Sequence, residues 1–203
     1  MDRKEIIILA SGSPRRRELM ELAGYTFTVE VSDADENVAE EDPGRMVEEL
    51  SLRKATAVAA LHQGDKGNCR IIGADTIVVL EGRVLGKPED EKDAARMLRA
   101  LSGRSHEVYT GVSILTMKDG AVTGRRQFHE CTRVRMREIS EEEITSYIRT
   151  GEPMDKAGAY GIQGKAAIFI SGIEGDYFNV VGLPVCHLSG ILGHPDSSTR
   201  IRQ

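Results

Sequence analysis

Short apolar runs alternate with longer amphipathic stretches along this chain. The apolar runs have the length of strands, and such alternation is typical of an α/β or α+β protein. The pattern predicts strands over 6–10, 26–31, 70–80 and 166–173, and a hairpin over 107–117 and 122–137. It predicts helices over 15–23, 43–61, 91–101, 140–149 and 183–192.

Residues that begin and end helices support these boundaries. Gly24 ends the first predicted helix, and Asp42 caps the second, which has Pro43 at its first position. Ser140 and Glu143 have the spacing of a capping box. Two stretches are predicted to be loops, namely the acidic residues 33–42 and the glycine-rich residues 151–164.

No internal repeat, low-complexity linker or clear boundary divides the chain. A length of 203 residues is enough for one domain with a substantial core. We therefore expect one domain over 1–193, in which helices flank a mixed twisted sheet. The polar residues 194–203 are expected to form a disordered tail.

Composition narrows the class of protein. No apolar run reaches the roughly 18 residues of a membrane span, and the run after residues 1–5 is too short for a signal peptide. Three widely spaced cysteines form neither a disulfide framework nor a zinc motif. The net charge of −5, with basic residues dispersed among acidic ones, disfavours a nucleic-acid partner. We expect a cytoplasmic protein without a membrane or nucleic-acid partner.

The segment Ser11-Gly12-Ser13-Pro14-Arg15-Arg16 lies between a predicted strand and a predicted helix. The free N–H groups of a helix start favour anions, and arginines there oppose the helix dipole unless an anion is near. The segment therefore predicts a phosphate site, although its spacing is not that of a Walker loop. The alternative is a solvated basic turn.

Carboxylates occur in two further candidate segments. Asp75 interrupts an apolar strand and follows Gly73-Ala74, so it lies at the mouth of a cleft, holds a cation, or is exposed on an edge strand. The cluster Asp33-Ala34-Asp35-Glu36 suits a hard cation such as Mg²⁺, but by pattern alone a solvated acidic loop is the favoured interpretation.

Two other segments could face a ligand. In Gly86-Lys87-Pro88 the proline restricts the backbone beside the lysine, which can then point steadily into a cleft. In residues 151–164 glycines and alanines surround Gln163, whose amide could read the edge of a base. The alternatives are that these segments are an ordinary turn and a structural loop, and by pattern alone Lys54 is an ordinary surface residue of a helix.

Taken together, these segments resemble the Maf family. The matching stretches occur in family order and span residues 6 to about 192. They are ASGSPRR (10–16), DADE (33–36), GADTIV (73–78), GKP (86–88), SGRSHEVYTGV (102–112), GEPMDKAGAYGIQG (151–164) and GDYFNVVGLP (175–184).

The resemblance implies a fold, a reaction and a set of site residues. The fold is that of the inosine triphosphate pyrophosphatases, with two lobes around a central nucleotide-binding cleft. The reaction is hydrolysis of a nucleoside triphosphate to the monophosphate and pyrophosphate, by a protein that commonly dimerises. Asp75 matches the general base, Glu36, Lys54 and Lys87 match other catalytic positions, and Ser11, Ser13, Arg15 and Arg16 match the phosphate loop.

Substrate choice is also implied by the resemblance. Arg15, Thr76 and Gln163 match the members that act on dTTP and UTP. Alternatives are the same reaction on 7-methyl-GTP or another modified nucleotide, or a nucleotide-sensing regulator of cell division and septum formation. For the enzyme, we expect Mg²⁺ or Mn²⁺ held by Glu36 and Asp75 to assist the attack of water on the triphosphate.

Overall fold

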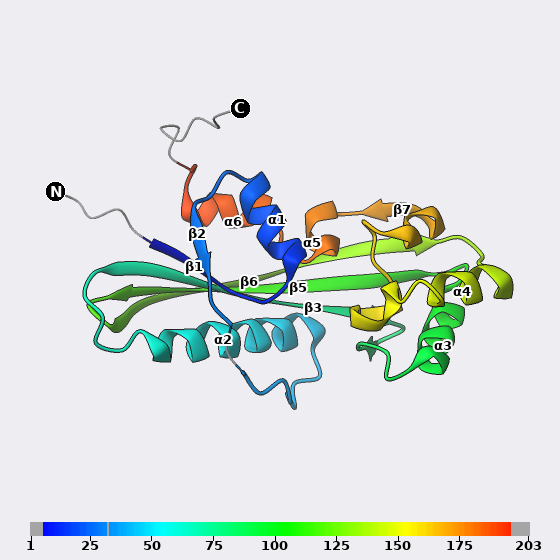
Figure 1. Ribbon diagram of the computed structural model, residues 1–203, viewed down its shortest axis with the longest axis horizontal. Helices are drawn as coiled ribbons and strands as arrows, with labels where there is room; N and C mark the ends of the chain where they lie inside the picture. The colour runs from blue at the N-terminus through cyan, green and yellow to red at the C-terminus, as the bar shows by residue number, and fades with distance from the viewer. Residues whose placement is uncertain (1–5, 32, 196–203) are drawn as a thin grey trace.

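A computed structural model describes residues 6–31 and 33–195 of the chain. One mixed sheet of seven strands runs along its length (Figure 1). Across the sheet the strands are β2 (Phe27–Val29), β1 (Ile6–Ala10), β3 (Asn68–Leu80), β5 (Ser105–Lys118), β6 (Ala121–Met136) and β7 (Ile170–Glu174), and β4 (Arg83–Leu85) pairs with β3. β1 is parallel to β2 and β3, and the other pairs are antiparallel.

Helices cover both faces of this sheet. They are α1 (Pro14–Leu22), α2 (Pro43–Leu61), α3 (Glu91–Leu101), α4 (Glu141–Ile148), α5 (Tyr177–Val181) and α6 (Val185–Leu192). Three short 3₁₀ helices, η1 (Glu152–Asp155), η2 (Ala157–Ala159) and η3 (Lys165–Phe169), follow α4. The predicted class, a mixed sheet with flanking helices, is confirmed.

The alternation of side chains along β3 separates two layers of core. Ile71 packs with Ala55 and Val58 of α2 on one face. Ile72 packs with Met20 of α1 and Leu188 of α6 on the other face. Successive strand residues point to opposite faces, so one apolar run serves both layers. A third cluster, with Leu98, Val134, Ile144 and Phe169 among its members, joins α3 and α4 to the sheet.

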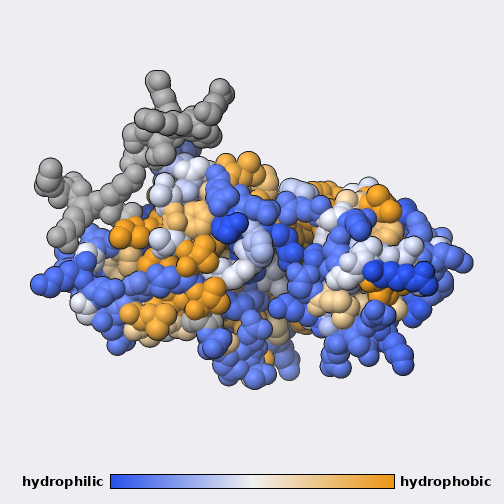
Figure 2. Space-filling model, viewed as in Figure 1, coloured by the Kyte–Doolittle hydropathy of each residue, from blue (hydrophilic) through white to orange (hydrophobic). Residues whose placement is uncertain are grey.

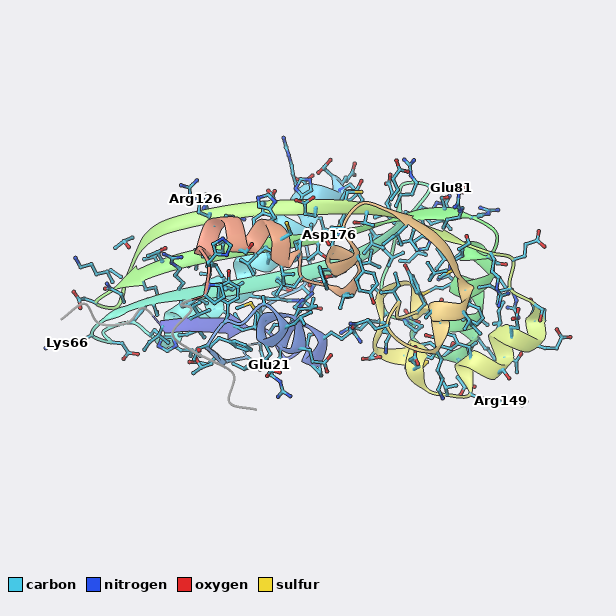
Figure 3. The ribbon with its side chains drawn as sticks, turned by 90° about the horizontal axis from the view of Figure 1, so that it is seen from above. Glu21, Lys66, Glu81, Arg126, Arg149 and Asp176 are labelled. Atoms are coloured by element: carbon cyan, nitrogen blue, oxygen red, sulfur yellow. The ribbon has the colours of Figure 1, made fainter. Side chains whose placement is uncertain are left out.

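These layers give the molecule two ends. β1, β2, α1 and α6 gather at one end, and α3, α4 and β7 gather at the other (Figure 1). Seen from above, Lys66 and Arg149 mark the two ends and Asp176 lies between them (Figure 3). On the face of Figure 2, hydrophobic side chains gather mainly toward the end of β1 and β2.

Within residues 6–31 and 33–195, no helix is both long and apolar enough to cross a membrane.

Some predicted boundaries are wrong, most clearly in the strand predicted over 166–173. Residues 165–169 form η3, and the strand begins at Ile170. Ala166 and Phe169 are buried, whereas Ile168 between them is 68% exposed. This period of three fits a 3₁₀ helix rather than a strand. The predicted loop at 151–164 holds η1 and η2.

The last segment of the chain also differs from the prediction. The helix α5 was not predicted, although Asp176 caps it by accepting a hydrogen bond from the backbone N–H of Phe178 at 2.8 Å. Of the expected disordered tail, residues 196–203 lie outside the described residues.

Candidate active site

An unpaired stretch of β3 forms the centre of the candidate site. β5 pairs with one side of β3 over almost its whole length. On the other side, β1 pairs only as far as Gly73, and β4 begins to pair at Val78. Residues 74–77, which include Asp75 and Thr76, therefore border an opening in the sheet between β1 and β4. Because β3 lies inside the sheet and the Asp75 side chain is only 13% exposed, the alternative of a surface aspartate on an edge strand is wrong.

This opening leads into a cleft of about 1160 Å³. Its walls come from the β1–α1 loop, the acidic loop before α2, α2 itself, the β4 region, residues 155–164 and the end of α5. All the predicted site residues line it, namely Ser11, Ser13, Arg15, Arg16, Glu36, Lys54, Asp75, Thr76, Lys87 and Gln163. Segments far apart in the sequence thus meet at one cleft.

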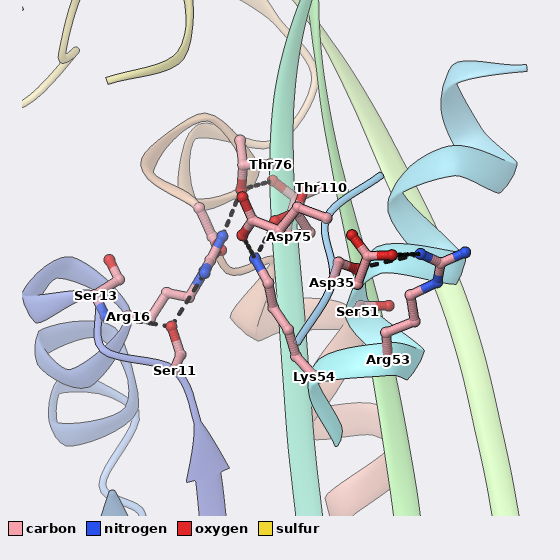
Figure 4. Close-up of polar contacts among 12 residues, drawn as sticks. Ser11, Ser13, Arg16, Asp35, Ser51, Arg53, Lys54, Asp75, Thr76 and Thr110 are labelled. Carbon is pink, nitrogen blue, oxygen red and sulfur yellow. Dashed lines mark hydrogen bonds and ion pairs between the residues drawn. The ribbon is translucent and has the colours of Figure 1, made fainter. Parts of the chain in front are cut away.

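Lys54 of α2 joins two carboxylates in this cleft (Figure 4 shows its bond to Asp75). Its Nζ lies 2.5 Å from Asp75 Oδ1 and 2.9 Å from Glu36 Oε1. The side chains of Asp75 and Lys54 are largely buried, whereas that of Glu36 is exposed. The hydrogen bond from Lys54, and secondly its charge, lower the pKa of the Glu36 carboxyl. Lys54 is thus no ordinary surface residue.

The position of Lys54 depends on close packing between α2 and the sheet. A Cβ atom on Gly73 would lie 2.2 Å from the carbonyl oxygen of Ser51, and one on Gly111 would lie 2.3 Å from Val47. Only glycine permits such an approach of helix to strand. Ser51 Oγ also hydrogen-bonds Ser113 Oγ of β5 at 2.8 Å, in a fully buried pair.

The start of α1 offers free donors to the cleft. Its cap residue, Ser13, makes no capping hydrogen bond with its side chain, and Pro14 begins the helix. Arg15 is partly exposed, and among the described residues its ion pair is with Asp155, at 3.8 Å. The helix dipole and Arg15 together therefore produce a positive electrostatic potential at this wall.

Arg16 differs from its neighbour because protein groups already bind its guanidinium. It donates to Gly182 O at 2.8 Å, Ser11 Oγ at 3.1 Å and Thr76 Oγ1 at 3.0 Å (Figure 4). Burial lowers the pKa of Arg16, and the charge of Asp75 opposes this effect. The alternative of a solvated basic turn is wrong for Arg16, which ties the phosphate loop to β3 and to the end of α5.

The hydroxyl groups behind Arg16 have a fixed direction of hydrogen bonding. Thr110 Oγ1 donates its single hydrogen to Asn179 O at 2.9 Å, so it accepts from Thr76 Oγ1, also at 2.9 Å. Thr76 in turn accepts from Arg16. Thr76 therefore keeps only one acceptor lone pair for a ligand. Thr110 and Asn179, both fully buried, fall within the matched stretches 102–112 and 175–184, but no local pattern marks either of them as part of the site.

The opposite wall carries Lys87 and Gln163. Both are exposed residues that line the cleft, and neither makes a hydrogen bond within the part of the chain that the structure describes. Lys87 lies near enough for its charge to contribute to the lowered pKa of Glu36. Both side chains are thus free to meet a ligand.

The carboxylates of Glu36 and Asp75 are the kind of oxygen ligand that Mg²⁺ and Mn²⁺ take. Both carboxylates hydrogen-bond the same Nζ, so their oxygens already converge on one cation. Mg²⁺ commonly takes one or two carboxylates and completes its shell with water and substrate phosphates. Among the described residues, no group of three or more His, Cys, Asp or Glu could hold a metal by itself. The donor set therefore fits a metal that arrives with a phosphate ligand.

Comparison with known proteins identifies the family. The family described as Maf-like protein matches residues 6–194. A dTTP/UTP pyrophosphatase of Bacillus cereus is 52% identical over 183 residues, which cover 90% of this chain and 86% of that protein. A dTTP/UTP pyrophosphatase of Bacillus cytotoxicus is 51% identical over 191 residues, covering 94% and 95%. This chain belongs to the Maf family, as the motifs predict.

A solved structure supports the fold. The Ham1 protein of Staphylococcus aureus matches 93% of this chain and 98% of its own, with a TM-score of 0.51 and 14% sequence identity. At this identity the likeness concerns the fold alone.

Proposed function

We propose that this chain hydrolyses nucleoside triphosphates, with dTTP and UTP as preferred substrates, to the monophosphate and pyrophosphate. One observation carries the proposal: a basic helix start faces the Lys54–Asp75–Glu36 group across a cleft that can hold a nucleotide. The names of the Bacillus relatives support the choice of substrate.

Asp75 is the proposed general base. Its carboxylate lies largely buried at the opening in the sheet, where a water molecule can approach a bound triphosphate. A positioned base contributes roughly 10²–10⁴-fold to a rate. Lys54 holds that carboxylate in place and brings a positive charge to the same point.

Cationic groups on both walls would bind the phosphates. Arg15 and the open start of α1 face the cleft from one side, and Lys87 faces it from the other. Fixed charges of this kind stabilise the negative charge that develops on departing pyrophosphate. Arg16 acts mainly by hydrogen-bonding both Ser11 of the phosphate loop and Thr76 of β3, which holds the loop in place against the strand.

Glu36 and Asp75 are the proposed holders of Mg²⁺ or Mn²⁺. When bound, such an ion would neutralise phosphate charge and make a coordinated water more acidic. The ammonium group of Lys54 has three hydrogen-bond donors on a flexible side chain. It could then turn one of these donors toward a phosphate oxygen.

Gln163 and Thr76 are proposed to select the base. The exposed amide of Gln163 offers a donor and an acceptor, whereas Thr76 offers only an acceptor. Uracil and thymine carry a hydrogen on N3 that an acceptor can bind, and cytosine does not. This difference supports a preference for dTTP and UTP over CTP.

Product analysis tests the reaction and its alternatives together. Purified protein with Mg²⁺ or Mn²⁺ should convert UTP to UMP and pyrophosphate, with little UDP. UDP as the main product would refute cleavage between the α and β phosphates. Preferred turnover of 7-methyl-GTP would replace the substrate assignment, and nucleotide binding without turnover would favour the sensor. The single domain over 1–193, the homodimer and the cytoplasmic location stay predictions.

A further inference from the structure

A strained stretch of backbone precedes the cleft wall that carries Gln163. Gly158 and Ala159 both have left-handed conformations, with φ of 68° and 61°. Such a conformation is uncommon for alanine and persists only where surrounding structure holds it in place. Gly158 meets Val78 closely, and its N–H donates to Gly86 O at 3.0 Å. The chain therefore turns sharply just before residues 160–164.

A buried pair of rings anchors the chain where this turn ends. Tyr160 Oη lies 2.7 Å from His106 Nε2, and the two rings meet edge to face. Both residues are almost fully buried. Burial lowers the pKa of His106 to about 4 and raises the pKa of Tyr160, so both groups are neutral near pH 7.

This hydrogen bond has no substitute on the histidine. Among the described residues, His106 Nδ1 has no partner, so the bond to Tyr160 is the only hydrogen bond of the imidazole. Breaking it would leave a buried ring without any polar partner, which is costly. The hydrogen bond therefore strongly favours one position of Tyr160. It thereby also fixes where residues 160–164, the cleft wall, begin.

Glu152 fixes the other end of the same wall. Its Oε2 accepts from the backbone N–H of Lys165 at 3.0 Å, and its Oε1 accepts from Tyr147 Oη at 3.0 Å. A Cβ on Gly164 would lie 2.0 Å from Glu152 Oε1, so the glycine allows this close contact. Residues 161–163 thus lie between two polar anchors and line the cleft.

We propose that His106 and Tyr160 are positioning residues that set nucleotide selectivity by fixing residues 161–163. His106 lies on β5, and its hydrogen bond to Tyr160 ties the wall that presents Gln163 to that strand. This inference rests on the proposed function, and in particular on Gln163 facing the base. The pair contributes to binding the base and not to the chemistry at phosphorus.

The test compares two tyrosines that each lose one hydroxyl group. Tyr160→Phe breaks the bond to His106, and Tyr25→Phe breaks a bond of 2.8 Å to Gly193 O at similar burial, outside the cleft lining. Steady-state kcat and KM are measured with UTP and with CTP, and melting temperature is measured without nucleotide. Because one hydrogen bond is removed, Tyr160→Phe should raise KM for UTP about threefold to tenfold, with kcat changed less than about twofold.

Selectivity distinguishes positioning from general stability. The ratio of kcat/KM for UTP to that for CTP should fall in Tyr160→Phe and stay unchanged in Tyr25→Phe. A second variant, Glu152→Gln, replaces one of the two acceptor oxygens at the far anchor with a donor, so it cannot keep both hydrogen bonds and should lower the same ratio.

Two other results have distinct meanings. A lower melting temperature with unchanged KM and ratio in both Tyr160→Phe and Glu152→Gln would overturn the positioning role. Failure of the wild-type protein to cleave any nucleotide between its α and β phosphates would instead overturn the proposed function.

Discussion

Lys54 Nζ lies 2.5 Å from Asp75 Oδ1, although the two residues come from a helix and a strand that are 21 positions apart in the sequence. The lysine also reaches Glu36, so one ammonium group organises both carboxylates of the cleft. The positions of the two carboxylates therefore depend on the position of α2, the helix that carries Lys54.

Asp75→Asn should lower kcat by about 10² or more, because the variant loses the proton acceptor and one charge for the metal. The shape of the side chain is preserved, so the fold should persist. Turnover of UTP is measured along with the circular dichroism spectrum. A folded variant with turnover near that of the wild type would rule out Asp75 as general base.

Two neighbours in the acidic loop should behave differently. Glu36 bonds Lys54 in the cleft, whereas Asp35 bonds Asn37 and lies 3.8 Å from Arg53. Glu36→Gln should therefore reduce turnover at limiting Mg²⁺ by at least about tenfold, and excess Mg²⁺ should partly restore it. Asp35→Asn is the matched control and should leave the metal dependence unchanged. An equal effect of both variants would show that the loop acts only through its total charge.

The structure also changes what is expected of the two arginines. The sequence suggests that either arginine opposes the helix dipole, so that its removal would not harm the nucleotide-free protein. Arg16 instead makes three hydrogen bonds, and Arg16→Ala should lower the free energy of unfolding by about 2–4 kcal/mol. Arg15→Ala should change it by less than about 0.5 kcal/mol and should weaken nucleotide binding. Urea denaturation without nucleotide measures the difference, and equal losses would contradict it.

Local patterns predicted the elements and the site segments, but not how tightly the elements pack. A glycine within a strand, such as Gly73, indicates only that something approaches the backbone closely, and in the structure this is the backbone of α2. Strong periodicity over 43–61 marked α2 itself, with its Asp42 cap in place. Helical spacing places Lys54 on the same face as the buried Val47, Leu50 and Val58, but it cannot show that the lysine reaches Asp75, because that depends on the register between α2 and β3. The likeness to the Maf motifs supplied this link.

The same limit applies to buried polar residues. Thr110, Asn179 and His106 are buried partners of residues that line the cleft, and their partners lie 34 or more positions away along the chain. Pairings of this kind arise from the fold, and a single sequence carries no period or spacing that reveals them. The η3 helix was missed for a related reason, because a short apolar segment fits a strand as well as a 3₁₀ helix.

Gly73→Ala should push α2 away from the sheet and destabilise the protein by about 3 kcal/mol, the upper range for overpacking. The added Cβ would lie 2.2 Å from the carbonyl oxygen of Ser51, which belongs to the backbone and cannot turn aside. Gly124→Ala is the control, since its Cβ would meet Thr116 at an ordinary 3.6 Å. Thermal denaturation compares the two variants. Similar melting temperatures would show that α2 shifts without cost.

Stability should rise with pH between about 4 and 6.5 because of His106. Burial lowers the pKa of His106 in the folded protein to about 4, so the unfolded chain binds more protons in this window. The wild type should lose about 3 kcal/mol of stability from this group as pH falls through the window.

His62 acts in the opposite direction: burial opposes protonation, but hydrogen bonds to Asp65 and Glu30 raise its pKa overall. Its contribution is present below pH 6.5 and is lost as pH rises. His106→Gln should therefore flatten the acid limb of the stability curve measured by urea denaturation, and an unchanged slope would contradict the burial of a neutral His106.

Gln163→Ala tests base recognition apart from catalysis. Gln163 is exposed in the cleft wall, and removing its amide should leave the fold and the phosphate-binding groups intact. A site built to hydrogen-bond one base discriminates strongly, because a wrong base leaves polar groups unpaired. The variant should therefore lower kcat/KM for dTTP and UTP about tenfold while changing the rates on GTP and CTP less, since one good bond to a base is worth roughly 1–3 kcal/mol. Asp75→Asn is the contrasting variant, because it should lower the rates on all four nucleotides by a similar factor. The four rates are measured at substrate concentrations below KM. Equal losses on every nucleotide in Gln163→Ala would place this amide against the phosphates, and the preference for uracil and thymine would then need another wall of the cleft to explain it.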